Sequence, residues 1–331
     1  MKQHAFLSAL AVSAVCFGSG MAGAADIELR ASHQWNTKDV RHKMVQIIAD
    51  EMDKADVGVK VKVFPGKSLY KPKEQWAPLT TGELDIAAFP LAYAAKRHRE
   101  FDATLMPGLV KNHEHAKRMN DSEFMDDIKK IINDNNVIVI SDAWLAGGFA
   151  SRKKCVLEPA DTKGQVFRAA GKAFERMVQG AGASIQSMPS SEIYTALQQG
   201  VLDGANTSSG SFVSYRLYEQ VKCLTAPGKY ALWFMYEPIL MSKASFDKLN
   251  DEQKKAIMAA GQKAEDWFAT KAAELDSTMV DTFKKAGVEV VEMTAEQADA
   301  WKKIADDTSY AAFSKKVKNG KELIGKALAA E

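Results

Sequence analysis

An arginine and a cluster of small hydrogen-bonding side chains stand at the ends of two predicted strands. The strand Val166-Phe167-Arg168 ends in a guanidinium, and the strand-like residues Val201 to Gly204 lead into a polar turn, Asn206 to Ser209. A guanidinium holds a carboxylate through two parallel hydrogen bonds. Because ligands of open α/β sheets bind at the carboxyl ends of strands, the pattern predicts an anion site. From the residues alone, a structural ion pair between Arg168 and Asp203 explains the arginine equally well.

The elements that must position these groups form a β-α-β-α passage. Ala173 to Val178 has the apolar spacing of a helix, and Ala183 to Met188 has the composition of a second short strand. The next helix opens at Pro189 to Glu192, with a capping serine and a first-turn carboxylate, and ends at Gly200. Such alternation predicts a parallel or mixed sheet with helices on its faces.

Many residues of this passage stand at fixed spacing. They are Asp161, Lys163, Gly164, Arg168, Gly182-Ala183, Ser191-Glu192, Tyr194, Ala196-Leu197-Gln198, Gly200, Asp203-Gly204 and Tyr218-Glu219. This pattern resembles the solute-binding subunit of tripartite ATP-independent periplasmic (TRAP) transporters, in the dicarboxylate-binding-protein-like family, and looser similarity covers nearly the whole mature chain. The resemblance implies a two-lobed α/β periplasmic solute-binding fold with a long helix spanning both lobes. It also implies that Arg168 binds the carboxylate of the solute.

Composition and the N-terminus indicate an exported globular protein. The 331 residues are 46% hydrophobic and 26% charged, with a formal net charge of +2, so no polyanionic partner such as nucleic acid is needed. Lys2 precedes an apolar run, Ala5 to Phe17, and small residues follow near Ala24, which predicts a signal peptide over residues 1–25. The run is shorter than the roughly 20 residues that span a bilayer. We therefore expect the protein in the periplasm.

Cysteine usage fits that compartment. Cys16 falls in the predicted leader, which leaves Cys155 and Cys223 in the mature chain. An even pair in an oxidising compartment predicts a disulfide. The alternative is two buried thiols that act as small apolar side chains.

The chain divides into two discontinuous lobes by its pattern and its resemblance. We expect residues 26–144 plus 235–275 in an N-terminal lobe, and residues 145–234 plus 276–331 in a C-terminal lobe that carries the arginine. The run 251–286 is rich in helix formers, with a cap at Asn250 and a stop at Gly287. The resemblance explains this unusual length as the helix that crosses both lobes.

Further ligand contacts are expected from the resemblance. Many members have an asparagine at the position of Thr207, and here Asn206 stands one residue earlier, so either side chain is a candidate. Aromatic residues that border the cleft in the family are Trp35, Trp76, Phe89, Trp144, Phe212, Trp233 and Tyr236. Singly, each has core packing as its simplest explanation. Together, about three of them are expected to touch the ligand, since pockets are mainly apolar.

The absence of a second arginine that some members carry indicates the class of ligand. Members that bind sialic acid carry a second arginine where this chain has Gly147-Gly148-Phe149. One clamped carboxylate is therefore expected, and a small hydroxy, keto or aromatic monocarboxylate fits best. A dicarboxylate would need Lys71 or Arg152 as its second cation.

Motifs of catalysis are missing from the sequence. It contains no G-x-S-x-G elbow, no H-E-x-x-H, no metal-ligand cluster and no phosphate-binding glycine loop. We expect a monomeric binding protein that delivers its solute to a TRAP-type permease, with no catalytic residues, metal or cofactor. One alternative is a receptor that presents its ligand to a membrane sensor. Another is a periplasmic hydrolase or lyase with His33 as base and Glu74 or Asp85 as its partner.

Overall fold

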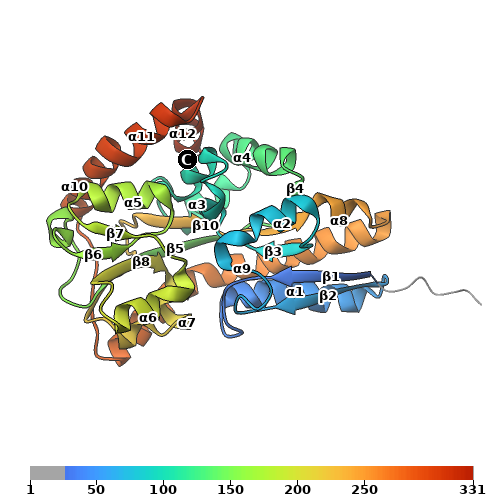
Figure 1. The fold of residues 1–331 in the computed structure, drawn as a ribbon, viewed down its shortest axis with the longest axis horizontal. Helices are drawn as coiled ribbons and strands as arrows, with labels where there is room; N and C mark the ends of the chain where they lie inside the picture. The colour runs from blue at the N-terminus through green and yellow to red at the C-terminus, as the bar shows by residue number, and fades with distance from the viewer. Residues whose placement is uncertain (1–26, 331) are drawn as a thin grey trace, which may run out of the picture.

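Two sheets, each covered by helices, form the two lobes of the protein (Figure 1). The computed structural model describes residues 27–330, so the predicted signal peptide and Cys16 lie outside the described residues. The first sheet has five strands in the order β2 (Val59–Phe64), β1 (Ile27–Ser32), β3 (Ile86–Ala88), β11 (Ile239–Ser242) and β4 (Val137–Ser141). The second has seven, in the order β12 (Glu289–Val291), β9 (Cys223–Thr225), β5 (Trp144–Ser151), β8 (Gly204–Ser208), β6 (Val166–Arg168) and β7 (Ser184–Gln186), with β10 (Trp233–Tyr236) paired to β5.

Both sheets mix parallel and antiparallel pairs, as the alternation of strands and helices predicts. In the first, β1 is parallel to β2 and β3, whereas β11 is antiparallel to β3 and β4. In the second, β6 is parallel to β7 and β8. The long strand β5 is antiparallel to its neighbours and is buried along its whole length.

Short helices cover the sheets. Those that follow first-lobe strands are α1 (Val40–Ala55), α2 (Trp76–Thr81), α3 (His113–Met119), α4 (Glu123–Asp134) and α8 (Lys243–Asp247), with 3-10 turns η1 (Pro72–Glu74), η2 (Leu91–Ala94) and η3 (Arg99–Leu105). Those that follow second-lobe strands are α5 (Gly171–Gly180), α6 (Ile193–Gln198), α7 (Ser209–Ser214), α10 (Ala295–Ala305), α11 (Ala311–Lys316) and α12 (Gly320–Leu328), with the 3-10 turns η4 (Pro159–Thr162), η5 (Ser190–Glu192) and η6 (Leu217–Glu219) and the π-helical segment η7 (Asp306–Tyr310). The last helix, α12, packs against α4 of the first lobe, so the chain end returns across the molecule (Figure 1).

The chain passes between the lobes at two adjacent points. One lies at Asp142-Ala143, between β4 and β5, and the other at Glu237-Pro238, between β10 and β11. The backbone N–H of Glu237 donates to the carbonyl of Ala143 at 2.8 Å, which ties the crossings together. The sequence predicts one apolar strand over 231–242. The structure has two strands there, in different sheets, because Pro238 has no N–H to continue a ladder.

A third connection is the long helix α9 (Asp251–Lys285), which runs across both lobes (Figure 1). It packs against α1 in the first lobe and α7 in the second, as the resemblance implies. Its predicted cap is present, since Asn250 and Gln253 form a reciprocal capping box. A glycine is needed at 261, because a Cβ there would lie 1.8 Å from the carbonyl oxygen of Ile140. No helix among residues 27–330 combines the length and apolar character that a bilayer span requires.

Cys155 and Cys223 form a disulfide, which confirms the predicted pairing. Their Cα atoms are 5.0 Å apart, and 68 residues separate them in sequence. The bond ties the segment before η4 to β9 in the second sheet. Closing a loop of this length restricts the unfolded chain and so stabilises the folded one.

Removing this bond should lower stability without changing the fold. For the double variant Cys155→Ala, Cys223→Ala we expect the free energy of unfolding to fall by about 4 kcal/mol or less, the loop-closure value for this length. Urea denaturation followed by circular dichroism measures the change, with the reduced wild type as a matched control. An unchanged midpoint in both samples would contradict this role.

Candidate ligand-binding site

Arg168 lies buried at the end of β6 and is held only by neutral acceptors. Its side chain is 1% exposed. Its Nε donates to the carbonyl of Met188 at 3.0 Å and its Nη1 to that of Asn206 at 2.7 Å. The predicted alternative partner, Asp203, instead pairs with Lys153 at 2.9 Å and accepts from the N–H of Val166. Among residues 27–330 no carboxylate forms an ion pair with Arg168, so this guanidinium keeps its charge available for an anion.

Asn206 reaches Arg168 with its backbone carbonyl, whereas its side chain contacts the residue before α5. The Oδ1 of Asn206 accepts from the N–H of Ala170 at 3.3 Å, while its Nδ2 has no partner among the described residues. Arg168 is paired with Ala205 in the parallel register of β6 and β8. Because successive side chains of a strand point to opposite faces, Arg168 shares a face with Thr207 and not with Asn206. The sequence predicts a turn here, whereas these residues form β8, because hydrogen bonds to β5 and β6 on both sides extend the backbone.

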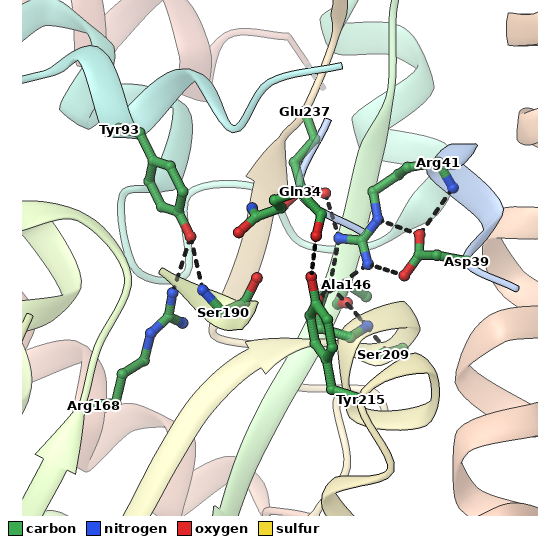
Figure 2. A network of polar contacts seen from close by, with 12 residues as sticks. Gln34, Asp39, Arg41, Tyr93, Ala146, Arg168, Ser190, Ser209, Tyr215 and Glu237 are labelled. Atoms are coloured by element: carbon green, nitrogen blue, oxygen red, sulfur yellow. Dashed lines mark hydrogen bonds and ion pairs between the residues drawn. The ribbon is translucent and has the colours of Figure 1, made fainter. Parts of the chain in front are cut away.

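Two tyrosines close the site between the lobes (Figure 2). The phenol oxygen of Tyr93, in the first lobe, accepts from Nη2 of Arg168 at 3.2 Å and from the N–H of Ser190 at 3.1 Å. From the second lobe, the hydroxyl of Tyr215 donates to the carbonyl of Gln34 at 3.1 Å. Burial, and then the charge of Asp39, raises the pKa of Tyr215 well above its usual value, so this phenol stays neutral. The lobes therefore meet directly around Arg168.

A second buried guanidinium, that of Arg41, lies beside this site but is fully paired (Figure 2). It is 1% exposed and forms a two-pronged pair with Asp39, with Nε–Oδ1 at 2.7 Å and Nη2–Oδ2 at 2.6 Å. Its Nη1 lies 2.7 Å from Oε2 of Glu237. It also donates to Ser208 and Ser211 of the second lobe, both at 3.0 Å.

The charges of this network shape one another. Burial raises the pKa of Glu237 above its usual value, although the nearby Arg41 opposes this. Burial acts in the same direction on Asp39, but the charge and hydrogen bonds of Arg41 outweigh it and hold the pKa of Asp39 below its usual value. Arg41 remains charged, since both carboxylates raise its pKa. We conclude that Arg41 is neutralised inside the protein, in contrast to Arg168.

Lysine 73 stands at the mouth of the cleft. A hollow of about 470 Å³ opens there, bordered by Lys73, Tyr93 and Lys172, among others. The ammonium of Lys73 lies 3.2 Å from Oγ of Ser187 in the opposite lobe. Loss of hydration beside neighbouring side chains, and then the charge of Arg168, lowers the pKa of Lys73. Lys73 is thus a cation close to Arg168, a place that sequence reasoning assigned to Lys71 or Arg152.

The predicted aromatic residues divide by location. Trp35 lies under the guanidinium of Arg41, 4.1 Å from ring centroid to Cζ. Phe89 packs edge-on against Tyr93, with centroids 6.2 Å apart, and Trp76 packs against Phe89 while bordering the hollow at the mouth. These three therefore lie close to the described site.

The other four pack elsewhere. Trp144 and Tyr236 pack in a tilted arrangement with ring centroids 4.9 Å apart. The indole N–H of Trp144 donates to Asn120, and the Tyr236 hydroxyl donates to Asp142. Phe212 packs against Phe283 of α9. Trp233 is buried on β10, directly opposite Gly147, which has no side chain to obstruct it.

Five residues of the site escaped the sequence analysis as ligand contacts, namely Gln34, Asp39, Arg41, Tyr93 and Tyr215. Gln34, Asp39, Arg41 and Tyr93 belong to the first lobe and face the second-lobe groups only when the lobes meet, and Tyr215 follows α7, far along the chain from Arg168, so no local spacing indicates any of the five. The one sequence feature that could have indicated them is the acidic and basic pair Asp39 and Arg41, two residues apart.

The described residues offer no evident metal site. Only one group of His, Cys, Asp and Glu ligand atoms among residues 27–330 is close enough to share an ion, formed by Cys155, Cys223 and Glu289. Its two sulfurs are joined in the disulfide and so cannot act as thiolate ligands.

Comparisons with known proteins agree with this architecture. A model of the family described as bacterial extracellular solute-binding protein, family 7, matches residues 31–316. A solute-binding protein from Albidiferax ferrireducens is 36% identical over 316 residues, which cover 94% of this chain and 93% of the relative. The structure of a TRAP periplasmic solute binding protein from Rhodoferax ferrireducens with bound malonate is 36% identical, with TM-score 0.87, and covers 91% of this chain and 98% of that one. One from Sulfurospirillum deleyianum with bound succinate is 26% identical, with TM-score 0.84, covering 93% and 100%.

Acid should destabilise the wall of the site through His33. Burial, and then the charge of His42, lowers the pKa of His33 from 6.5 to about 4. Between these two pH values His33 binds a proton in the unfolded chain but not in the folded chain. The contribution of His33 is therefore complete above pH 6.5 and is lost as the pH falls towards 4, by about 3 kcal/mol in total.

Urea denaturation of wild type and His33→Gln at pH 7.5, 6, 5 and 4 measures this loss. We expect the free energy of unfolding to fall more steeply in the wild type across this interval. Equal slopes in the two proteins would show that His33 does not titrate as its burial requires.

Proposed function

This chain belongs to family 7 of the bacterial extracellular solute-binding proteins, and on that premise we propose that Arg168 clamps the carboxylate of its ligand. The family match and the two TRAP structures confirm the resemblance found in residues 161–219. The protein is a periplasmic receptor that captures a small organic carboxylate for a TRAP-type transporter. The family is one of binding proteins, and we propose that the ligand leaves chemically unchanged.

One observation carries the role of Arg168. A buried guanidinium without an ion-pair partner is costly, because burial removes the hydration of its charge. Backbone carbonyls and Tyr93 fix the fork in place, and an incoming carboxylate would supply the missing countercharge. The same group is thus rigid before binding and unneutralised until binding, as a preorganised anion site requires.

Ion pairing in the site favours a single carboxylate. Asp39 and Glu237 both pair with Arg41, whereas Arg168 has no ion pair among the described residues. The fork of one guanidinium holds one carboxylate, which supports a small monocarboxylate.

A dicarboxylate is the second candidate, and a specific observation favours it. The relative from Rhodoferax ferrireducens, at 36% identity, was solved with malonate bound. In this chain Lys73 would have to receive the second carboxylate, since its ammonium lies near Arg168. That lysine is exposed and hydrogen-bonded to Ser187, so it is a weaker anchor than a second buried arginine.

Closure of the lobes would retain the ligand. We place the lobe boundaries at the crossings 142–143 and 237–238, next to the long helix α9. Tyr93 and Lys73 reach Ser190 and Ser187 of the opposite lobe, and these bonds form only when the lobes meet. A ligand that contacts both lobes stabilises the closed state over the open one. The closed form would then be the one presented to the permease.

Arg168→Ala should weaken binding strongly. Removing one partner of a buried charge pair typically costs about 2 to 5 kcal/mol, or about thirtyfold to several thousandfold in Kd. Titration calorimetry measures the loss, with Arg168→Lys as a conservative variant and Arg118→Ala, an exposed arginine on α3, as the matched control. A loss of less than about fivefold in a folded Arg168→Ala protein would make this residue structural.

A panel of C3 to C8 acids separates the two ligand classes. We expect monocarboxylates to raise the melting temperature of the wild type but not of Arg168→Ala. Stabilisation by dicarboxylates, with no response to any monocarboxylate of the panel, would overturn the monocarboxylate proposal in favour of the second candidate. A response to sialic acid alone would overturn the proposal of a small acid without supporting that candidate.

A further inference from the structure

Gln34 is a buried side chain whose amide has no partner. It follows β1 and is 2% exposed, and neither its Nε2 nor its Oε1 is hydrogen-bonded to any described residue. Of residues 27–330, it is the one side chain with two buried unpartnered polar atoms. Buried polar groups are nearly always paired, because an unpaired one loses its hydrogen bonds to water without replacement.

The amide of Gln34 lies in the site that Arg168 defines. Figure 2 shows it between the Arg168–Tyr93 contact and the Arg41–Glu237 pair. Its own backbone carbonyl accepts a hydrogen bond from the hydroxyl of Tyr215 at 3.1 Å. A ligand held by Arg168 through its carboxylate would therefore have Gln34 as a neighbour when the lobes are closed.

The chemistry of a primary amide defines its best partner. An N–H donor and a carbonyl acceptor stand side by side, so a second amide can satisfy both through two parallel hydrogen bonds. A carboxylate can accept from Nε2 but offers nothing to Oε1. A hydrocarbon satisfies neither atom. The conclusion also holds if the Gln34 amide is rotated so that Nε2 and Oε1 change places, because neither atom has a partner among the described residues.

We propose that the ligand is an amide-bearing carboxylic acid, such as a lactam acid or an amic acid, and that Gln34 recognises its amide through two hydrogen bonds. This inference rests on the proposed function, in which Arg168 holds the carboxylate. Gln34 is then the residue that sets specificity, while Arg168 supplies the common anchor.

Two sets of equally sized probes test the idea by calorimetry. One compares malonamate with malonate and isovalerate, and the other compares 5-oxopyrrolidine-2-carboxylate with 3-methylcyclopentanecarboxylate. In the wild type we expect at least one amide acid to bind about tenfold or more tighter than its hydrocarbon counterpart, because a site built for hydrogen bonds rejects analogues that lack them. Malonamate should also bind tighter than malonate.

The variants Gln34→Leu and Gln34→Met should remove this preference, with amide acids falling to the affinity of their hydrocarbon counterparts. Because the readout is a ratio of two affinities within one variant, a general loss of stability cancels. Binding of the hydrocarbon acids should still depend on Arg168.

The outcomes separate the inference from the proposed function. Equal affinity for amide and hydrocarbon acids in the wild type, with binding lost in Arg168→Ala, would overturn the role of Gln34 and keep that of Arg168. Preference for malonate over malonamate would likewise overturn it. Binding that persists in Arg168→Ala would instead contradict the proposed function.

Discussion

A buried guanidinium that the protein itself does not neutralise is the constraint on which this site depends. Arg168 and Arg41 are equally buried, yet two carboxylates surround Arg41, whereas Arg168 meets only carbonyls and a phenol. At Arg41 the protein supplies the countercharge itself, and removing one partner of such a buried pair typically costs about 3 to 5 kcal/mol. At Arg168 the missing countercharge is the part that a ligand would bring.

The two-lobed fold buries the charge of Arg168 where the lobes meet. Two crossings and α9 connect the lobes, so relative motion is limited to rotation about these adjacent segments. Arg41, although it belongs to the first lobe, contacts Ser208 and Ser211 of the second. The same closure that joins these groups brings Tyr93 onto Arg168. Binding and closure therefore use neighbouring contacts.

The residue pattern correctly predicted those strands and helices that are determined within a short segment of the sequence. The strands 27–32, 137–141 and 166–168 and the capped helix from Asn250 agree with the structure, because alternation and capping are properties of short segments. The break at Pro238 and the inclusion of Asn206 in β8 depend on pairing partners far along the chain, and the sequence prediction was wrong there. Gln34 belongs to the site only through contacts between lobes, which no spacing reveals.

Mass spectrometry of the small molecule released by denaturing the protein, purified from its native host, tests the central claim most directly. The account predicts one predominant ligand with a single carboxyl group, recovered unchanged after renewed incubation with the protein, and bound by the wild type but not by Arg168→Ala. A released ligand without a carboxyl group, or one that binds Arg168→Ala as tightly as the wild type, would contradict it.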